Sequence, residues 1–298
     1  MKTKSFKFLL FFLLISLFIK TDYRLDTGIY CCKDDHDYYA HAETLAIDFD
    51  FDYSNQFLDN EFERFNFQGK PAPSGFFGSG LLASPFLFIG NIFDNVFKSS
   101  ALFNYKLIFY SFSSVFYLTF TCILWNKTFR NLEKQINPLF VYLFILGSGI
   151  GYFAFERYSM SHVYEVFSIS LVIYLSIKYC KSNLKIYSLA VPLSVCLALM
   201  IRWVNLYVLI IPYVVIRLLE NKNINFRSNR LMIISSILST GLFLFHTYLI
   251  YGVVTLNPEF VYNTSGTMDK YIASNPSIFL FLTNNIKNLF VLLFSFEF

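Results

Sequence analysis

The sequence predicts an all-α membrane protein with about eight transmembrane helices and one large loop near its N-terminus. Of the 298 residues, 55% are apolar and 20% are aromatic, and the mean hydropathy is +0.49, which is well above that of soluble domains. The apolar residues form runs long enough to cross a bilayer. The basic residues lie in short clusters between these runs, which is typical of cytoplasmic loops, so the net charge of +4 does not indicate a nucleic-acid partner.

The chain begins with the apolar run Phe8–Ile19, which follows three lysines, Lys2, Lys4 and Lys7. No small-residue cleavage site comes after the run, so we expect a retained first helix with its N-terminus in the cytoplasm. Residues 21–100 then form the first extracytoplasmic loop with its juxtamembrane helices. Residues 101–298 form the transmembrane bundle, and the whole chain is expected to be one domain.

The segment 21–74 is the one long polar stretch, and it holds twelve of the twenty acidic residues. It ends in a turn rich in glycine and proline at residues 69–75. The following run, Phe76–Phe97, is apolar but interrupted by Gly78, Gly80, Pro85 and Gly90. These interruptions favour a helix at the outer membrane interface over a clean span.

The later apolar blocks predict seven further spans, which are Leu102–Trp125, Pro138–Phe155, Val163–Ile177, Ile186–Ile201, Trp203–Ile216, Leu231–Tyr251 and Ile278–Phe296. The connections that this layout places inside carry ten basic residues and only two acidic ones, Glu133 and Glu220. The charge pattern thus agrees with a cytoplasmic N-terminus. Because no basic anchor follows the final span, we expect a chain that is cut short after Phe298.

Two neighbouring carboxylates, Asp34 and Asp35, lie close after the first predicted helix, and Tyr38 follows them. A carboxylate at the water interface can act as a general base, and two adjacent carboxylates raise one another's proton affinity. An acidic run is equally typical of a solvated loop without a catalytic role.

The pattern Asp34-Asp35-x-x-Tyr38, with Ala40 and Ala42 behind it, resembles the first periplasmic loop of the polytopic GT-C glycosyltransferases. The likeness is to bacterial relatives of the protein mannosyltransferases and of the lipid A aminoarabinose transferase. Further stretches resemble family segments more loosely, and these are Asp48-Phe49-Asp50-Phe51, Gly69 to Phe86, Arg157 to His162, Arg202-Trp203-Val204-Asn205 and Tyr251-Gly252. Two features depart from the family: the second acid is Asp rather than Glu, and the C-terminal domain is absent.

The resemblance implies an inverting transfer of a sugar from a polyprenyl-phosphate donor to a lipid, glycan or protein acceptor. It implies Asp34 as the base, with Asp35 as a helper or metal contact and Tyr38 in the substrate site. A leaving lipid phosphate needs cations, and the candidates at the outer face are Arg157, Arg202 and Lys270. The same residues could instead reach toward lipid headgroups without further function.

His162 and Glu165 are three residues apart at the start of a predicted span, so they share one helix face. Two ligands do not make a metal site unless Asp50 or Asp52 completes it, so we assign no metal residue, although a divalent cation could assist. The alternatives to a transferase are a transporter, a non-catalytic membrane scaffold and an inactive truncated relative. A transporter is disfavoured because charges within the predicted spans are nearly absent. The expected location is a bacterial inner membrane.

Overall fold

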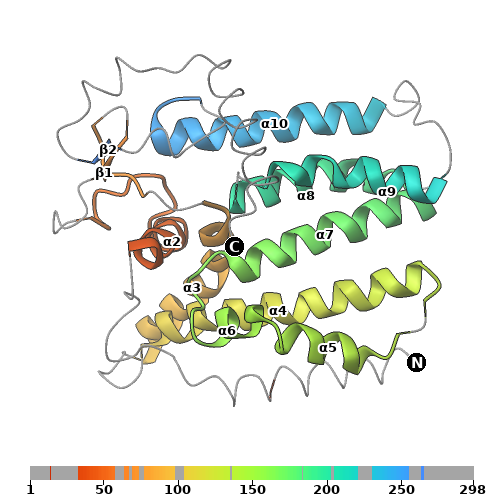
Figure 1. Cartoon of the computed structure of the whole chain (residues 1–298). Coiled ribbons are helices and arrows are strands. Elements are labelled where there is room, and N and C mark those ends of the chain that lie inside the picture. The colour runs from red at the N-terminus through yellow and green to blue at the C-terminus, as the bar shows by residue number, and fades with distance from the viewer. Residues whose placement is uncertain are drawn as a thin grey trace, which may run out of the picture.

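The structure, a computed structural model, is built from helices and one short ladder of two strands (Figure 1). It describes residues 14, 33–57, 64–66, 69–73, 77–97, 104–134, 136–182, 184–202, 205–220, 230–254 and 263–264. The elements before the bundle are α2 (Lys33–Glu43), the π-helical turn η1 (Thr44–Asp48), β1 (Arg64–Phe65) and α3 (Phe77–Phe97). The remaining elements are α4 (Tyr105–Asn131), α5 (Pro138–Leu146), α6 (Gly149–Phe155), α7 (His162–Lys181), α8 (Ile186–Ile201), η2 (Leu206–Leu209), α9 (Ile211–Glu220), α10 (Arg230–Tyr251) and β2 (Asn263–Thr264). The final predicted span and Lys270 lie outside the described residues, as does the first predicted helix apart from Leu14.

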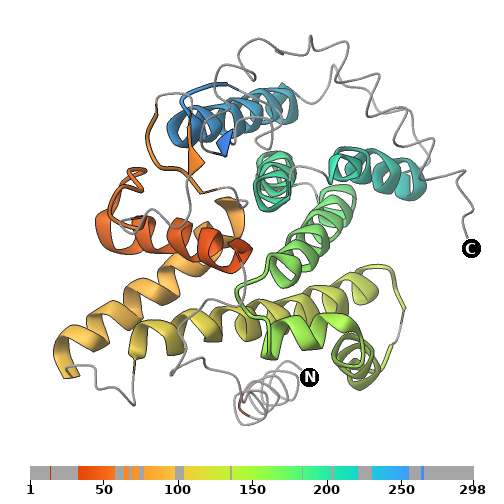
Figure 2. The same ribbon diagram turned by 60° about the vertical axis from the view of Figure 1, so that its left-hand side comes forward.

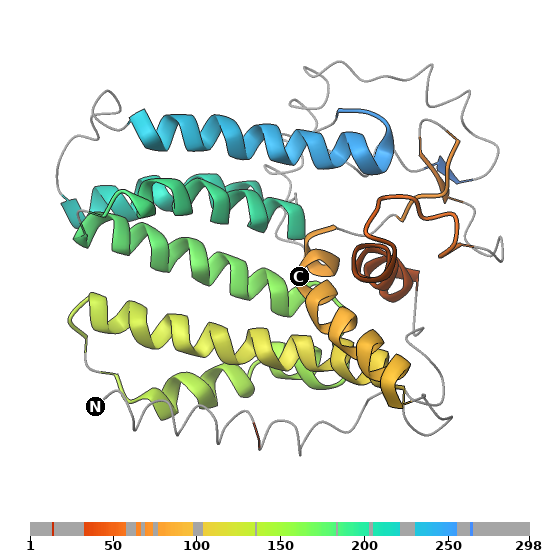
Figure 3. The same ribbon diagram turned by 180° about the vertical axis from the view of Figure 1, so that it is seen from behind.

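Helices α4, α7, α8 and α10 lie side by side with their axes nearly aligned, and α2 lies across one end of them (Figures 1 and 3). Apolar side chains fill the space between α4, α5 and α7, with Leu118, Cys122 and Val163 fully buried. Hydroxyl groups add bonds between helices, because Ser113 Oγ and Tyr164 Oη are 2.6 Å apart. Small hydroxyl side chains that bond across apolar helices are typical of membrane bundles.

Four helices in the described part of the chain are long and apolar enough to cross a membrane, namely α3, α4, α7 and α10. The number rises to five if α5 and α6 together count as one span. The shorter apolar stretches 186–201 and 206–219 fall below this length. The all-α membrane class is therefore confirmed at this coarser level, and the number eight stays a prediction.

The predicted span Pro138–Phe155 is not one continuous helix in the structure, because the chain bends by 75° between α5 and α6. Ser148 starts a new helix there, since its hydroxyl accepts a hydrogen bond from the N–H of Ile150 at 3.3 Å. The bend also requires glycine at position 151, where a Cβ atom would lie 2.5 Å from the carbonyl oxygen of Leu146. The pair forms a broken span or a re-entrant loop.

The predicted span Trp203–Ile216 also differs from the structure. Its described part is a short 3-10 turn, η2, followed by α9, and Pro212 lies in the first turn of α9. Proline fits that place because the first N–H groups of a helix have no partner within it.

The glycines of α3 do not break the helix, and α3 continues through Pro85. Their role is close packing instead. A Cβ atom at Gly78 would lie 2.5 Å from the backbone nitrogen of Ile201 in α8, and one at Gly80 would overlap the Cβ atom of His41 in α2. Figures 2 and 3 show α3 running obliquely beside α2 at the end of the bundle. The glycines thus let α3 hold α2 against the bundle.

The two ends of the bundle differ in charge. The end away from α2 receives the C-terminal turns of α4 and α7 and the N-terminal turn of α10, which carry Arg130, Lys178, Lys181 and Arg230 (Figure 1). The end near α2 carries the first turn of α2 with its acidic residues. This separation matches the charge pattern from which the sequence predicts orientation.

The polar segment after η1 is tied to the C-terminal end of α10. Strands β1 and β2 pair antiparallel, with Arg64 opposite Thr264 and Phe65 opposite Asn263. The buried amide of Asn66 donates a hydrogen bond to the carbonyl oxygen of Ile250 at 3.0 Å. These contacts hold the first loop beside the bundle.

Candidate functional site

Helix α2 brings the two neighbouring acids to the end of the bundle. Asp34 and Asp35 lie in the first turn of α2, where a helix favours negative charge. Successive residues of a helix point about 100° apart, so the two side chains enter different surroundings. Asp34 is exposed, whereas Asp35 is fully buried.

Asp35 is held by the connection between α6 and α7. The Ser159 hydroxyl donates a hydrogen bond to Asp35 Oδ1, and Arg157 Nη2 lies 3.8 Å from Asp35 Oδ2. A buried carboxylate needs such partners because an unpaired charge away from water is costly. Asp35 therefore joins α2 to the α6–α7 connection.

Tyr38 lies one helical turn after Asp34 and is buried. Its hydroxyl donates a hydrogen bond to Ser161 Oγ at 3.4 Å. Burial raises the pKa of Tyr38 to about 12, while the bond to Ser161 and the charge of Arg202 oppose the rise and the charges of Asp34 and Asp37 add to it. Tyr38 thus joins α2 to the connection before α7 through Ser161.

Glu165, which lies in the first turn of α7, contacts three further side chains. Arg202 Nη1 donates to Glu165 Oε2 at 3.2 Å, and Asn205 Nδ2 donates to Glu165 Oε1 at 2.5 Å. His162 Nδ1 lies 3.8 Å from Glu165 Oε2, and the His162 ring packs on Phe153 with a centroid distance of 4.1 Å. Glu165 therefore joins the start of α7 to the end of α8.

The residues that the sequence predicts are brought together at one end of the bundle. Asp34, Asp35 and Tyr38 come from α2, Arg157 and His162 from the α6–α7 connection and the start of α7, and Arg202 from the end of α8; Lys270 lies outside the described residues. The sequence reasoning missed Ser159 and Ser161, which contact Asp35 and Tyr38. Both lie within the stretch Arg157 to His162, so the loose resemblance of that stretch to a family segment was their only signal.

No group of three or more His, Cys, Asp or Glu side chains in the described ranges is arranged to hold a metal ion. Asp50 and Asp52 do not complete a site with His162 and Glu165. Asp50 instead accepts a hydrogen bond from Thr44 at 2.9 Å, and Asp52 accepts one from the Ser54 hydroxyl at 2.6 Å.

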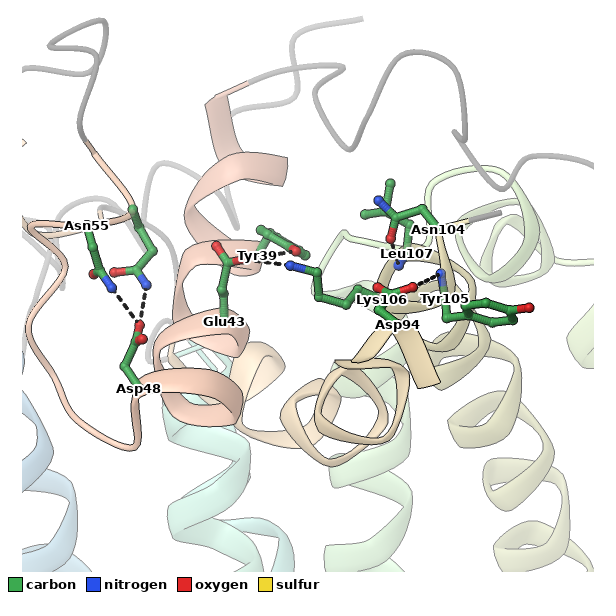
Figure 4. Close-up of polar contacts among 10 residues, drawn as sticks. Tyr39, Glu43, Asp48, Asn55, Asp94, Asn104, Tyr105, Lys106 and Leu107 are labelled. Atoms are coloured by element: carbon green, nitrogen blue, oxygen red, sulfur yellow. Dashed lines mark hydrogen bonds and ion pairs between the residues drawn. The ribbon is translucent and has the colours of Figure 1, made fainter. Parts of the chain in front are cut away.

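A second polar cluster lies at the other end of α2, as Figure 4 shows. Tyr39 donates a hydrogen bond to Glu43 at 3.2 Å, and Lys106 Nζ lies 3.9 Å from the same carboxylate oxygen. Asp94 of α3 accepts hydrogen bonds from the first two N–H groups of α4, those of Tyr105 and Lys106, at 2.9 and 3.1 Å. This cluster fixes α2 and α3 to the start of α4.

No protein-family model, curated protein or solved structure matches this chain, so the site is defined by its own residues and their geometry.

Proposed function

We propose that this chain is an integral membrane glycosyltransferase of the GT-C type, which moves a sugar from a polyprenyl-phosphate donor to a lipid, glycan or protein acceptor. One observation carries the proposal. At one end of the bundle, the exposed carboxylate of Asp34 lies in α2 beside Asp35, whose carboxylate is 3.8 Å from the guanidinium group of Arg157. Transfer from a lipid phosphate needs a base and a cation next to each other at the membrane surface.

Asp34 is the general base in this proposal. The acceptor hydroxyl oxygen attacks the anomeric carbon, the bond from that carbon to the phosphate oxygen breaks, and the hydroxyl proton passes to Asp34. Asp35 is unsuited to this role because it is buried against Ser159 and Arg157. Tyr38, with a pKa of about 12, keeps its proton at neutral pH and acts as a hydrogen-bond donor.

Arg157 and Arg202 are the cations for the leaving lipid phosphate. A guanidinium group binds phosphate oxygens through two parallel N–H bonds. Each arginine is already oriented by a carboxylate, Arg157 by Asp35 and Arg202 by Glu165.

The α2 end faces the outside of a bacterial inner membrane in this proposal, and the N-terminus is cytoplasmic. The basic residues at the opposite end of the bundle support this orientation, because cytoplasmic loops are enriched in lysine and arginine. A polyprenyl-phosphate sugar in the outer leaflet would meet the site directly.

The experiment measures transfer of labelled sugar from a panel of polyprenyl-phosphate donors in membranes that contain the full chain. Asp34→Asn is expected to lower the rate by about 10²-fold or more at equal protein level, as loss of a general base does. Asp48→Asn is the matched control, because Asp48 is another acid of the first loop and its carboxylate accepts hydrogen bonds from Asn55 and Gln56. The control should transfer at the wild-type rate.

Undiminished transfer by Asp34→Asn would remove the proposed base. Absence of transfer by the wild-type chain from every donor would favour a non-catalytic scaffold, a transporter or an inactive relative.

A further inference from the structure

The ion pair between Glu165 and Arg202 leaves the arginine partly exposed, so a phosphate could compete with the glutamate for it. Arg202 Nη1 donates a hydrogen bond to Glu165 Oε2 at 3.2 Å. The side chain of Arg202 is 31% exposed, whereas that of Glu165 is 15% exposed. In this pair the cation is therefore more accessible than the anion to a dissolved or lipid-borne phosphate.

The backbone explains why the two charges face each other. Helices α7 and α8 pack against each other in opposite directions, so the start of α7 and the end of α8 lie at the same level (Figure 1). Glu165 lies in the first turn of α7, and Arg202 follows the last residue of α8, with its N–H bonded to the carbonyl of Ala198. The helix dipoles favour an anion at the first place and a cation at the second.

Glu165 keeps its other oxygen bonded when Arg202 is taken by another anion. Asn205 donates to Oε1 at 2.5 Å, and His162 lies 3.8 Å from Oε2. The carboxylate can therefore lose part of its contact with Arg202 without becoming an unpaired buried charge. That loss would otherwise be costly.

We propose that Glu165 is an internal anion that occupies Arg202 in the empty site and competes with phosphate for it. The proposal rests on the proposed function for the identity of the phosphate, which is that of a polyprenyl phosphate. A sugar donor is a phosphodiester with one negative charge, and the leaving phosphate monoester carries up to about two at neutral pH. The carboxylate of Glu165 repels the leaving polyprenyl phosphate more strongly than the less charged sugar donor. Glu165 therefore weakens the binding of the leaving phosphate at Arg202 and favours its release.

The test measures binding of farnesyl phosphate to the purified full chain in detergent, with inorganic phosphate and uncharged farnesol as companion probes. Glu165→Gln keeps the size and the acceptor oxygen but removes the charge. It is expected to tighten farnesyl phosphate binding by about tenfold and to leave farnesol binding unchanged. Glu43→Gln is the matched control, since Glu43 is also a half-buried carboxylate paired with a cation, Lys106, and it should bind as the wild type does.

A double-mutant cycle separates competition from a general effect on folding. In an Arg202→Ala background, Glu165→Gln should no longer change farnesyl phosphate binding, because the group for which both anions compete is gone. If inorganic phosphate shows the same dependence and the same strength, the site takes free phosphate and the competition by Glu165 stands.

Weaker or unchanged binding by Glu165→Gln would overturn the proposal, as would a gain that persists without Arg202. Failure of sugar transfer, with the binding results as expected, would remove the proposed function alone.

Discussion

Asp34 and Asp35 are neighbours in the chain, yet α2 gives them opposite surroundings. Asp34 is exposed, and Asp35 is buried against a serine and an arginine that lie more than 120 positions later. No local pattern predicts which of two adjacent acids is buried, because the partners come from a distant connection. The sequence could thus indicate the acidic pair but not divide its roles.

The difference between the two acids predicts different effects on stability. Asp35→Asn should lower the free energy of unfolding by about 2–4 kcal/mol, because it leaves Arg157 without its charge partner in a mostly buried place. Asp34→Asn should change it by less than about 0.5 kcal/mol, as exposed substitutions do. Denaturant or thermal unfolding in detergent measures both. Equal losses in the two variants would contradict the assignment of Asp35 as the structural acid.

Glu43 gives a prediction about pH. Burial raises the pKa of Glu43 above its ordinary value, and Lys106 and the hydrogen bond from Tyr39 oppose the rise only in part. The folded state therefore holds the proton more tightly than the unfolded state, and stability is lost as pH rises from the ordinary pKa of about 4.3 through the raised one. Glu43→Gln does not ionise, so its melting temperature relative to wild type should increase between pH about 4 and pH about 7. A relative melting temperature that falls over this range would mean that the pair with Lys106 dominates.

At the scale of elements, the position of α2 depends on close approach by α3. A methyl group at Gly80 would overlap His41, whose ring also contacts Tyr53 through Nδ1 at 2.8 Å. Because α2 carries both acids and Tyr38, a shift of α2 would move the whole candidate site.

Gly80→Ala is expected to destabilise the protein by about 1–3 kcal/mol, the usual cost of overpacking. Gly241→Ala in α10 is the matched control, since a Cβ atom there meets nothing within 4 Å. The control should be neutral or stabilising by up to about 1 kcal/mol, because alanine favours a helix over glycine. Unfolding measurements on both variants check this, and a harmless Gly80→Ala would contradict the packing argument.

The helices themselves were largely predictable. The apolar run Ile186–Ile201 coincides with α8, because Lys185 and Arg202 flank it. The run Leu231–Tyr251 differs from α10 by one residue, because Arg230 precedes it and Gly252 follows it. The run Pro138–Phe155 gave no sign of the bend between α5 and α6, because its apolar composition continues through the change of direction at Ser148. Hydropathy measures how apolar a segment is, and a single helix N-cap residue within the segment hardly changes that value.

The glycines of α3 have a packing role that the sequence does not reveal. Glycine ends helices in many proteins, but in a membrane bundle it also permits close helix packing. Only the neighbours of Gly78 and Gly80 in space distinguish these roles, and those neighbours lie in α8 and α2.

At the scale of the whole molecule, the charge difference between the bundle ends predicts orientation. In a variant without native cysteines, Ser54→Cys near α2 and Lys185→Cys at the start of α8 should react with a membrane-impermeant maleimide from opposite sides. We expect Ser54→Cys to react in intact cells and Lys185→Cys only after the membrane is opened. Reaction of both from one side would contradict a membrane-crossing bundle, and the reverse pattern would invert the proposed orientation.

The central claim is that Asp34 takes the proton of the acceptor while the cations at the same bundle end hold the lipid phosphate. Single-turnover sugar transfer, measured together with donor binding in one sample, tests it most directly. Asp34→Asn should bind the polyprenyl-phosphate donor within about threefold of wild type and transfer its sugar about 10²-fold or more slowly. Transfer at the wild-type rate by donor-bound Asp34→Asn would contradict the claim.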